Sequence, residues 1–319
     1  MSYPDLPDFD KFSELITCYS QLKHEYGAEG VKDIIKEIED NMKSGINQLK
    51  ELEPGQEVIQ KEPNQLNEIK ELRPDGPRQM TDKIDSDKYR DRLEGALLGR
   101  FAGCTLGAPV EFWSIEKMER LARENNMAFP PKDYWNYVPD PYQKRYEVSE
   151  RELYTRNKID GVPVDDDVTY TILGLLIAED YGIDFSVEDV GQAWLDYLPY
   201  ACTAEEIALK NLREGIDPLK AGEKDNPYRE WIGADIRSDP WGYMAPGFPE
   251  KAADMAYHDA YISHRRQGIY GEMFFSAVIA AALEVDDPIE AVKIGLTEIP
   301  EESALTEAIQ WALNKSPDI

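Results

Sequence analysis

Three consecutive aspartates, Asp165, Asp166 and Asp167, stand before an apolar run in the stretch VDDDVTY. One Asp there is typical of a helix N-cap, because its carboxylate accepts backbone N–H groups and suits the positive end of the helix dipole. Three exceed that role, since each charge raises the cost of ionising the others. Mg²⁺ or Mn²⁺ would reverse this cost, because both prefer hard oxygen ligands. The stretch predicts a helix cap, a solvated loop or one arm of a metal site.

A second candidate segment carries a glycine at every fourth position, Gly95, Gly99, Gly103 and Gly107, and ends in the letters GAPVE at Glu111. At this spacing the glycines share one face of a helix. Each costs about 1 kcal/mol in a helix interior relative to Ala. We therefore expect a second backbone or a ligand to approach this face closely, with tight helix packing as the simpler alternative. Glu111 becomes a candidate if the helix belongs to a site.

The stretch IGADIRSDPWGYMAPG, residues 232–247, is rich in glycine and proline, which predicts a structured loop rather than a helix. Backbone amides at Gly233 and Gly242 can face an anion, and Arg237 can pair with a phosphate. The alternative is an ordinary ion pair between Arg237 and Asp235 or Asp239.

Two of the three histidines, His258 and His264, fall in one expected helix. They are six residues apart and point in different directions, so they do not form a two-histidine zinc pair. His264 follows Ser263 at the expected helix end. It has either a capping or core role, or it reaches a ligand.

The elements that must position these residues are predicted from hydrophobic spacing. Apolar residues recur at helical intervals, and strand signals are scarce. An all-α domain is expected over 87–319, preceded by a helical extension at 1–51 and a linker at 52–86 that is rich in proline, glycine and polar residues. The helices expected in the domain are 87–106, 114–125, 168–181, 186–197, 204–214, 249–262, 269–284, 288–296 and 301–314.

Composition limits the possible functions. The 319 residues carry a formal net charge of −28, so neither nucleic acid nor an anionic membrane surface is an expected partner. Three widely spaced cysteines argue against a disulfide framework and suit a reducing, cytoplasmic compartment. No apolar stretch is long enough to span a bilayer, and the N-terminus lacks the pattern of a secretory signal.

Taken together and in this order, these segments resemble the ADP-ribosylglycohydrolase family. The glycine-rich helix ending in GAPVE, the aspartate turn, the Gly233–Gly247 stretch and Ser263-His264 each match a family motif, over about residues 87–319. The resemblance implies an orthogonal helical bundle and a binuclear Mg²⁺ or Mn²⁺ centre. The implied activity is hydrolysis of an ADP-ribosyl N- or O-glycosidic bond, in a small-molecule or modified-protein substrate.

The resemblance also implies roles for individual residues. Asp166 and Asp167 would be metal ligands, with Asp165 and Asp166 as the alternative register. Glu111 would gate the site and assist the leaving group, and Asp166 would share the catalytic role. Gly233, Gly242 and Arg237 would hold the diphosphate, and His264 would contact the nucleotide.

Three departures from the family pattern qualify this expectation. Cys104 replaces an Asp that commonly follows the glycine at 103, and Val168 replaces a Thr. A second acidic metal motif, D-x-D-T, is expected near the C-terminus, but only Asp286-Asp287 before Pro288 is found after residue 264. The sequence thus predicts a C-terminally incomplete domain with one metal arm, weakly active or inactive alone. The alternative is a non-catalytic helical module that binds ADP-ribose or a protein partner.

Overall fold

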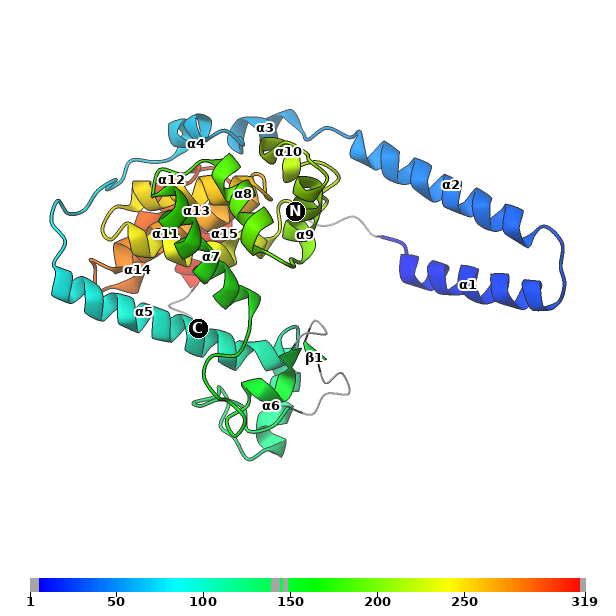
Figure 1. The fold of residues 1–319 in the computed structure, drawn as a ribbon, viewed down its shortest axis with the longest axis horizontal. Helices are drawn as coiled ribbons and strands as arrows, with labels where there is room; N and C mark the ends of the chain where they lie inside the picture. The colour runs from blue at the N-terminus through cyan, green and yellow to red at the C-terminus, as the bar shows by residue number, and fades with distance from the viewer. Residues whose placement is uncertain (1–5, 139–143, 146–148, 316–319) are drawn as a thin grey trace. The chain divides into compact units, whose positions relative to one another are not determined.

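A computed structural model of the chain describes residues 6–138, 144–145 and 149–315. The chain divides into two compact units, Met1–Ile59 and Gln60–Ile319. The first unit is a pair of contacting helices, α1 (Phe9–Glu25) and α2 (Val31–Lys50), drawn in blue in Figure 1. Gly27 and Gly30 between them have φ values of +70° and +81°, a region that glycine adopts without steric cost. Within the described part of this unit, neither helix has a fully buried residue.

The second unit is built around α13 (Gln267–Ala282), which is buried along most of its length. It contacts η3 (Ile232–Arg237), α11 (Asp239–Met244), α12 (Pro249–Tyr261) and α14 (Pro288–Gly295) (Figure 1). The facing surfaces of α12 and α13 are rich in alanine, which lets the two helices pack closely. Together these helices form the core on which the motif-bearing segments rest.

Three further helices cover this core: α7 (Asp166–Tyr181), α8 (Val187–Tyr197) and α9 (Thr203–Arg213). Helix α8 begins at a capping box, in which Ser186 and Asp189 satisfy each other's backbone N–H groups. The aspartate motif stands at the start of α7, so packing of α7 on η3, α8 and α11 sets its position.

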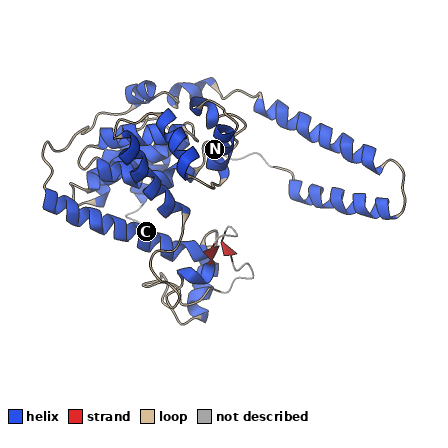
Figure 2. Ribbon diagram, in the orientation of Figure 1, coloured by secondary structure: helices blue, strands red, loops and turns tan. Residues whose placement is uncertain are grey.

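The remaining described elements complete an all-α fold, as expected, apart from one short antiparallel pair of strands (Figure 2). In that pair Lys144 lies opposite Glu150, and Arg145 opposite Ser149. The elements not yet named are α3 (Gln56–Lys61), α4 (Leu66–Leu72), α5 (Ser86–Gly107), η1 (Ala108–Val110), α6 (Ile115–Glu124), β1 (Lys144–Arg145), β2 (Ser149–Glu150), η2 (Arg151–Tyr154), α10 (Pro218–Ala221), η4 (Leu296–Glu298) and α15 (Ala304–Lys315).

Residues 60–86, expected as part of a linker, belong to the second unit and pack against the rest of it. Ile69 on α4 is fully buried in its main core. Arg73 forms ion pairs of 2.5 Å with both Glu250 and Glu298, and Arg78 lies 2.9 Å from Glu298. The polar composition suggested a loose segment. The acids that pair with these arginines lie about 200 positions further along the chain, so local residue spacing gives no sign of the ion pairs. The compact unit therefore reaches back to Gln60.

The glycine face of α5 differs from the expectation. A Cβ atom at Gly95, Gly99, Gly103 or Gly107 would meet nothing within 4 Å among the described residues. All four glycines are exposed. The close approach predicted from their spacing is therefore absent in the described part of the chain.

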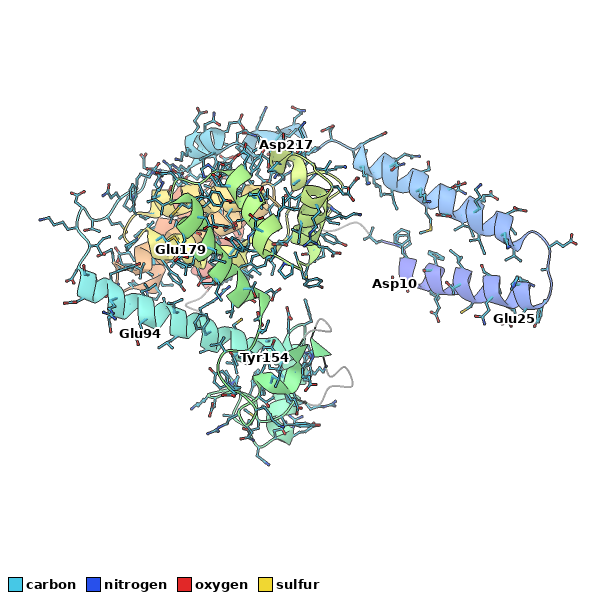
Figure 3. The ribbon with its side chains drawn as sticks, viewed as in Figure 1. Asp10, Glu25, Glu94, Tyr154, Glu179 and Asp217 are labelled. Atoms are coloured by element: carbon cyan, nitrogen blue, oxygen red, sulfur yellow. The ribbon has the colours of Figure 1, made fainter. Side chains whose placement is uncertain are left out.

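Acidic side chains are spread over the exposed surface of both units. Asp10 and Glu25 stand near opposite ends of α1, and Glu94, Glu179 and Asp217 are exposed on the second unit (Figure 3). Among the described residues, no helix combines the length and the apolar character needed to cross a membrane.

Candidate functional site

The three aspartates occupy the first turn of α7 and its cap. Asp165 is the N-cap residue, and its carboxylate accepts the backbone N–H of Asp167 at 3.1 Å. Its carbonyl oxygen accepts the Thr169 hydroxyl at 2.7 Å and the Thr169 N–H at 2.9 Å. The helix therefore begins at Asp166, two residues before the expected start at Val168, and the N-cap interpretation describes Asp165.

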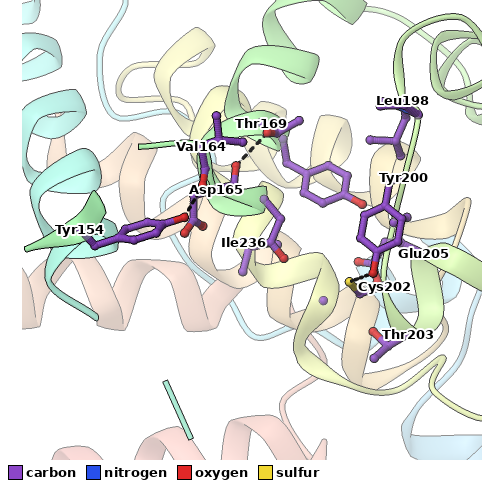
Figure 4. A pocket seen from close by; sticks show the side chains of 15 residues that line it. Tyr154, Val164, Asp165, Thr169, Leu198, Tyr200, Cys202, Thr203, Glu205 and Ile236 are labelled. Carbon is purple, nitrogen blue, oxygen red and sulfur yellow. Dashed lines mark hydrogen bonds between the residues drawn. The ribbon is translucent and has the colours of Figure 1, made fainter. Parts of the chain in front are cut away.

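The three carboxylates do not point the same way. Ligand atoms of Asp165, Asp167 and Cys104 lie within 4.8 Å of one another. Asp166 lies outside this group. It lines a cavity at the start of α7. Asp165, Thr169 and Glu205 line the same cavity (Figure 4). Asp165 is the N-cap residue with an extended backbone conformation, so helical spacing does not set the direction of its side chain relative to Asp167. The pair that converges is Asp165 and Asp167, rather than either pair of adjacent aspartates.

A positive charge already stands beside this group. Arg100 of α5 lies 3.1 Å from Asp167 Oδ1 and 3.3 Å from Asp239 Oδ2, and it donates to the carbonyl of Ile236 at 2.6 Å. Burial raises the pKa of the Cys104 thiol, and the nearby carboxylates of Asp167 and Asp165 raise it further. The thiol is therefore protonated at neutral pH, so the charge of the group comes from its two carboxylates.

These donors fit a divalent cation only in part. Two carboxylates are suitable ligands for a hard cation such as Mg²⁺ or Mn²⁺. A neutral thiol is a poor ligand for either, because soft sulfur selects softer metals. Among the described residues this is the one such group of three potential ligands, so a cation held here would take most of its remaining ligands from water.

Glu111 follows the short helix η1, where α5 ends, and is half-buried. It does not line the described cavity beside Asp166. Its position is set by a small apolar cluster of Val110, Leu121, Trp135 and neighbouring residues, in which the Trp135 indole donates to the carbonyl of Leu106 at 3.1 Å.

Arg237 is buried in the core and does not line the described cavity beside Asp166. Its guanidinium lies 2.9 Å from Asp259, 3.3 Å from Glu272 and 3.6 Å from Glu205, and it donates to the Ser263 hydroxyl at 3.0 Å. Only 1% of its surface is exposed. The ion pairs of Arg237 differ from both expectations, phosphate binding and pairing with Asp235 or Asp239. Its acidic partners come instead from α9, α12 and α13.

The expected loop at 232–247 is instead two short helices, η3 and α11. Pro240 stands in the first turn of α11, where its missing N–H costs nothing. Gly233 lines the cavity, and a Cβ atom there would lie 2.4 Å from Glu205 Oε1. Gly242 packs against α13, where a Cβ atom would lie 2.5 Å from Ile279. Only Gly233 of these two predicted site residues therefore reaches the cavity.

His264 is completely buried at the end of α12. Its Nδ1 lies 2.8 Å from the Ser263 hydroxyl. Burial holds the pKa of His264 well below its ordinary value, and the charges of Arg237 and Arg265 lower it further. The imidazole is thus neutral, in the core position that the sequence offered as the alternative to ligand contact.

Glu205, a third acidic residue of the cavity wall beside Asp165 and Asp166, was not predicted from the sequence. Glu205 is 3% exposed and lies on the buried face of α9 with Ala208, Leu209 and Leu212. A carboxyl group at the apolar positions of an amphipathic helix was the signal that could have found it.

The model of the ADP-ribosylglycohydrolase family matches residues 85–318. The chain therefore belongs to the ADP-ribosylglycohydrolase family, whose members act on ADP-ribosylated substrates and are generally metal-dependent. No curated protein and no solved structure matches the chain.

Proposed function

We propose that this protein hydrolyses the glycosidic bond of an ADP-ribosyl group. The observation that carries the proposal is the convergence of Asp165 and Asp167 with the glycine-rich helix, beside a cavity large enough for part of a nucleotide. The family match over residues 85–318 supports it.

Asp165 and Asp167 would hold a divalent cation, Mg²⁺ or Mn²⁺. When bound, the cation would supply charge stabilisation and a binding point for ribose hydroxyls. Asp166, on the cavity wall, can accept a proton from a water that enters the cavity. Glu111 remains a proposed catalytic residue on the strength of its motif at the end of α5.

The cation is expected to bind weakly, since two carboxylates are its only charged ligands among the described residues. Arg100 competes for Asp167 from a distance of 3.1 Å. This ion pair also favours a second candidate function, metal-free binding of an ADP-ribosyl group without hydrolysis.

One experiment separates the two functions. Peptides carrying arginine-linked or serine-linked ADP-ribose are incubated with the purified protein in Mg²⁺, Mn²⁺ or EDTA, and released ADP-ribose is measured by chromatography. Release that requires a divalent cation and is lost in the Asp165→Asn/Asp167→Asn double variant supports hydrolysis. Glu179→Gln, an exposed acid on the same helix, is the matched control. Binding of ADP-ribose in EDTA without any release supports the second function.

A further inference from the structure

The first unit exposes apolar side chains that are spaced for packing against another helix. On α1 these residues form a seam with spacings of three, four and three positions: Phe12, Leu15, Tyr19 and Leu22. Their side chains are 37–60% exposed. Alternating spacings of three and four place apolar residues along one stripe of a helix, which is the pattern by which helices pair in bundles. The α1 seam is therefore largely uncovered by the residues that the structure describes.

Helix α2 carries a second seam with spacings of four, three and four positions: Val31, Ile35, Ile38 and Met42. The two helices run antiparallel and are joined by a short turn (Figure 1). Apolar residues of both seams line one groove of about 340 Å³ between the helices. Ile35 and Met42 are nevertheless 39% and 54% exposed. The two helices thus form one apolar layer with an open face, which is half of a four-helix bundle.

The exposed apolar surface of this layer is large enough for a stable protein–protein interface. Eleven large apolar residues between Phe9 and Leu49 are each 37–72% exposed. At about 200 Å² for a residue of this size, they present on the order of 1,000 Å² of surface. The largest apolar patch of a typical monomer is roughly 300–600 Å², and a stable interface buries about 800 Å² on each partner. The area therefore indicates an interface rather than an ordinary monomer surface.

The charges around the layer favour a second copy of this chain over a basic partner. Residues 9–50 carry eight acidic residues and six lysines, so they are nearly balanced although the whole chain has a formal net charge of −28. Acids and lysines are interspersed on α2, where Glu39 and Lys43 form a 2.5 Å ion pair. A basic peptide would gain little from so balanced a surface, and two copies of it would repel each other little.

We propose that the apolar layer of α1 and α2 binds the same layer of a second copy of this chain, forming a four-helix bundle about a two-fold axis. Such an axis brings the same surface of both subunits together, so each apolar layer covers its counterpart. The helices have 17 and 20 residues, and their similar lengths of about 26 and 30 Å let the seams align. A segment of about 40 residues rarely builds a sufficient core alone, and pairing supplies one. The inference does not depend on the proposed hydrolysis.

The test measures the mass of the full-length protein by sedimentation equilibrium over a range of concentrations. One chain has a mass of 36.4 kDa, and a species of twice that mass is expected for the wild type. Ile35→Asp should raise the dissociation constant of the dimer at least about 100-fold, because the two-fold axis buries the new carboxylate twice in an apolar interface. Ile35→Leu keeps the seam apolar and should remain dimeric at concentrations at which Ile35→Asp is monomeric.

Ser44→Asp is the matched control, because it adds the same charge at an exposed position of α2 outside the seam. It should leave the dissociation constant within about threefold of the wild-type value. A wild type that stays monomeric at every concentration would overturn the proposal, since the layer would then be bare or covered within its own chain. A dimer that persists in a Leu15→Asp/Ile35→Asp double variant would also overturn it, by placing the interface on the second unit.

A second measurement leaves the seams intact, so it does not depend on whether a variant folds. Cys18 is exposed on α1 and accepts a spin label, once the other two cysteines have been changed to serine. Because the helices are about 30 Å long and Cys18 lies near the middle of α1, the two labels of a bundle should lie within about 40 Å of each other. A dimer whose labels lie further apart would overturn the proposal.

Discussion

Replacing Arg237 by Met removes the cation that pairs with a buried group of three acids. Asp259, Glu272 and Glu205 lie 2.9, 3.3 and 3.6 Å from the guanidinium, and its side chain is 2% exposed. Removing one partner of a buried ion pair typically costs about 3–5 kcal/mol, because the remaining charge is left uncompensated. Total stability of a folded domain is typically about 5–15 kcal/mol, so Arg237→Met should remain measurable but much weakened.

The loss is expected to depend on pH. Burial already raises the pKa of Glu205 to about 7 and that of Glu272 well above its ordinary value. Without Arg237 the folded-state pKa values rise further, while the unfolded values are unchanged. The folded variant then binds more protons than the unfolded chain, so its stability falls as pH rises. The deficit relative to wild type should therefore be smaller at pH 5.5 than at pH 8.

Urea unfolding followed by tryptophan fluorescence measures this effect in the second unit alone, since all six tryptophans lie after residue 59. Trp194 is a close reporter, with its ring centre 5.0 Å from the Arg237 guanidinium carbon. Arg120→Met is the matched control, because Arg120 is 71% exposed and its 4.0 Å pair with Glu124 should contribute less than about 1 kcal/mol. A loss below about 1 kcal/mol in Arg237→Met, or one that grows on acidification, would refute the reasoning.

Three further predictions use the same assay. Gly99→Ala should raise stability by about 0.5–1 kcal/mol, because the site is open and helical, and a lower urea midpoint would reveal a hidden close contact. Ile69→Ala should cost about 2–5 kcal/mol, whereas a cost near zero would show that the 60–86 segment is detached from the domain. Glu205→Gln should make the free energy of unfolding depend less on pH. The Glu205 carboxyl has a pKa of about 7 in the fold and about 4.3 in the unfolded chain, so the wild type loses on the order of 3 kcal/mol of stability as pH rises through this range. An unchanged slope of unfolding free energy against pH in the variant would contradict this.

The helices were predictable because their apolar periodicity is local. Expected bounds such as 249–262 and 288–296 differ from α12 (Pro249–Tyr261) and α14 (Pro288–Gly295) by one residue at the C-terminal end. The segments that were predicted wrongly are held in place by partners far away in the sequence. Residues 60–86 looked like a linker because the acids that pair with Arg73 and Arg78 come from α12 and η4.

The site was predicted as a set of segments but not as a geometry. The aspartate motif and Gly233 do meet at one cavity, whereas Arg237 and His264 turned out to be buried in the core. The order of motifs along the chain cannot distinguish a residue whose side chain faces a ligand from one that is buried in the core behind the site. Glu205 was not predicted because its signal, a carboxyl group at an apolar position of α9, is seen only once the buried face of that helix has been identified.

The repulsion among Asp165, Asp166 and Asp167 is reduced by groups of the protein itself, before any cation is considered. Asp165 is occupied by the cap, Asp167 pairs with Arg100, and Asp166 turns to the cavity. The triple aspartate is therefore not in itself a demand for metal, although two of its carboxylates remain suitable ligands. Because Asp165 and Asp167 form one group with Cys104 of α5 and Asp166 lies outside it, substitutions at 165 and 167 should affect cation dependence more than a substitution at 166.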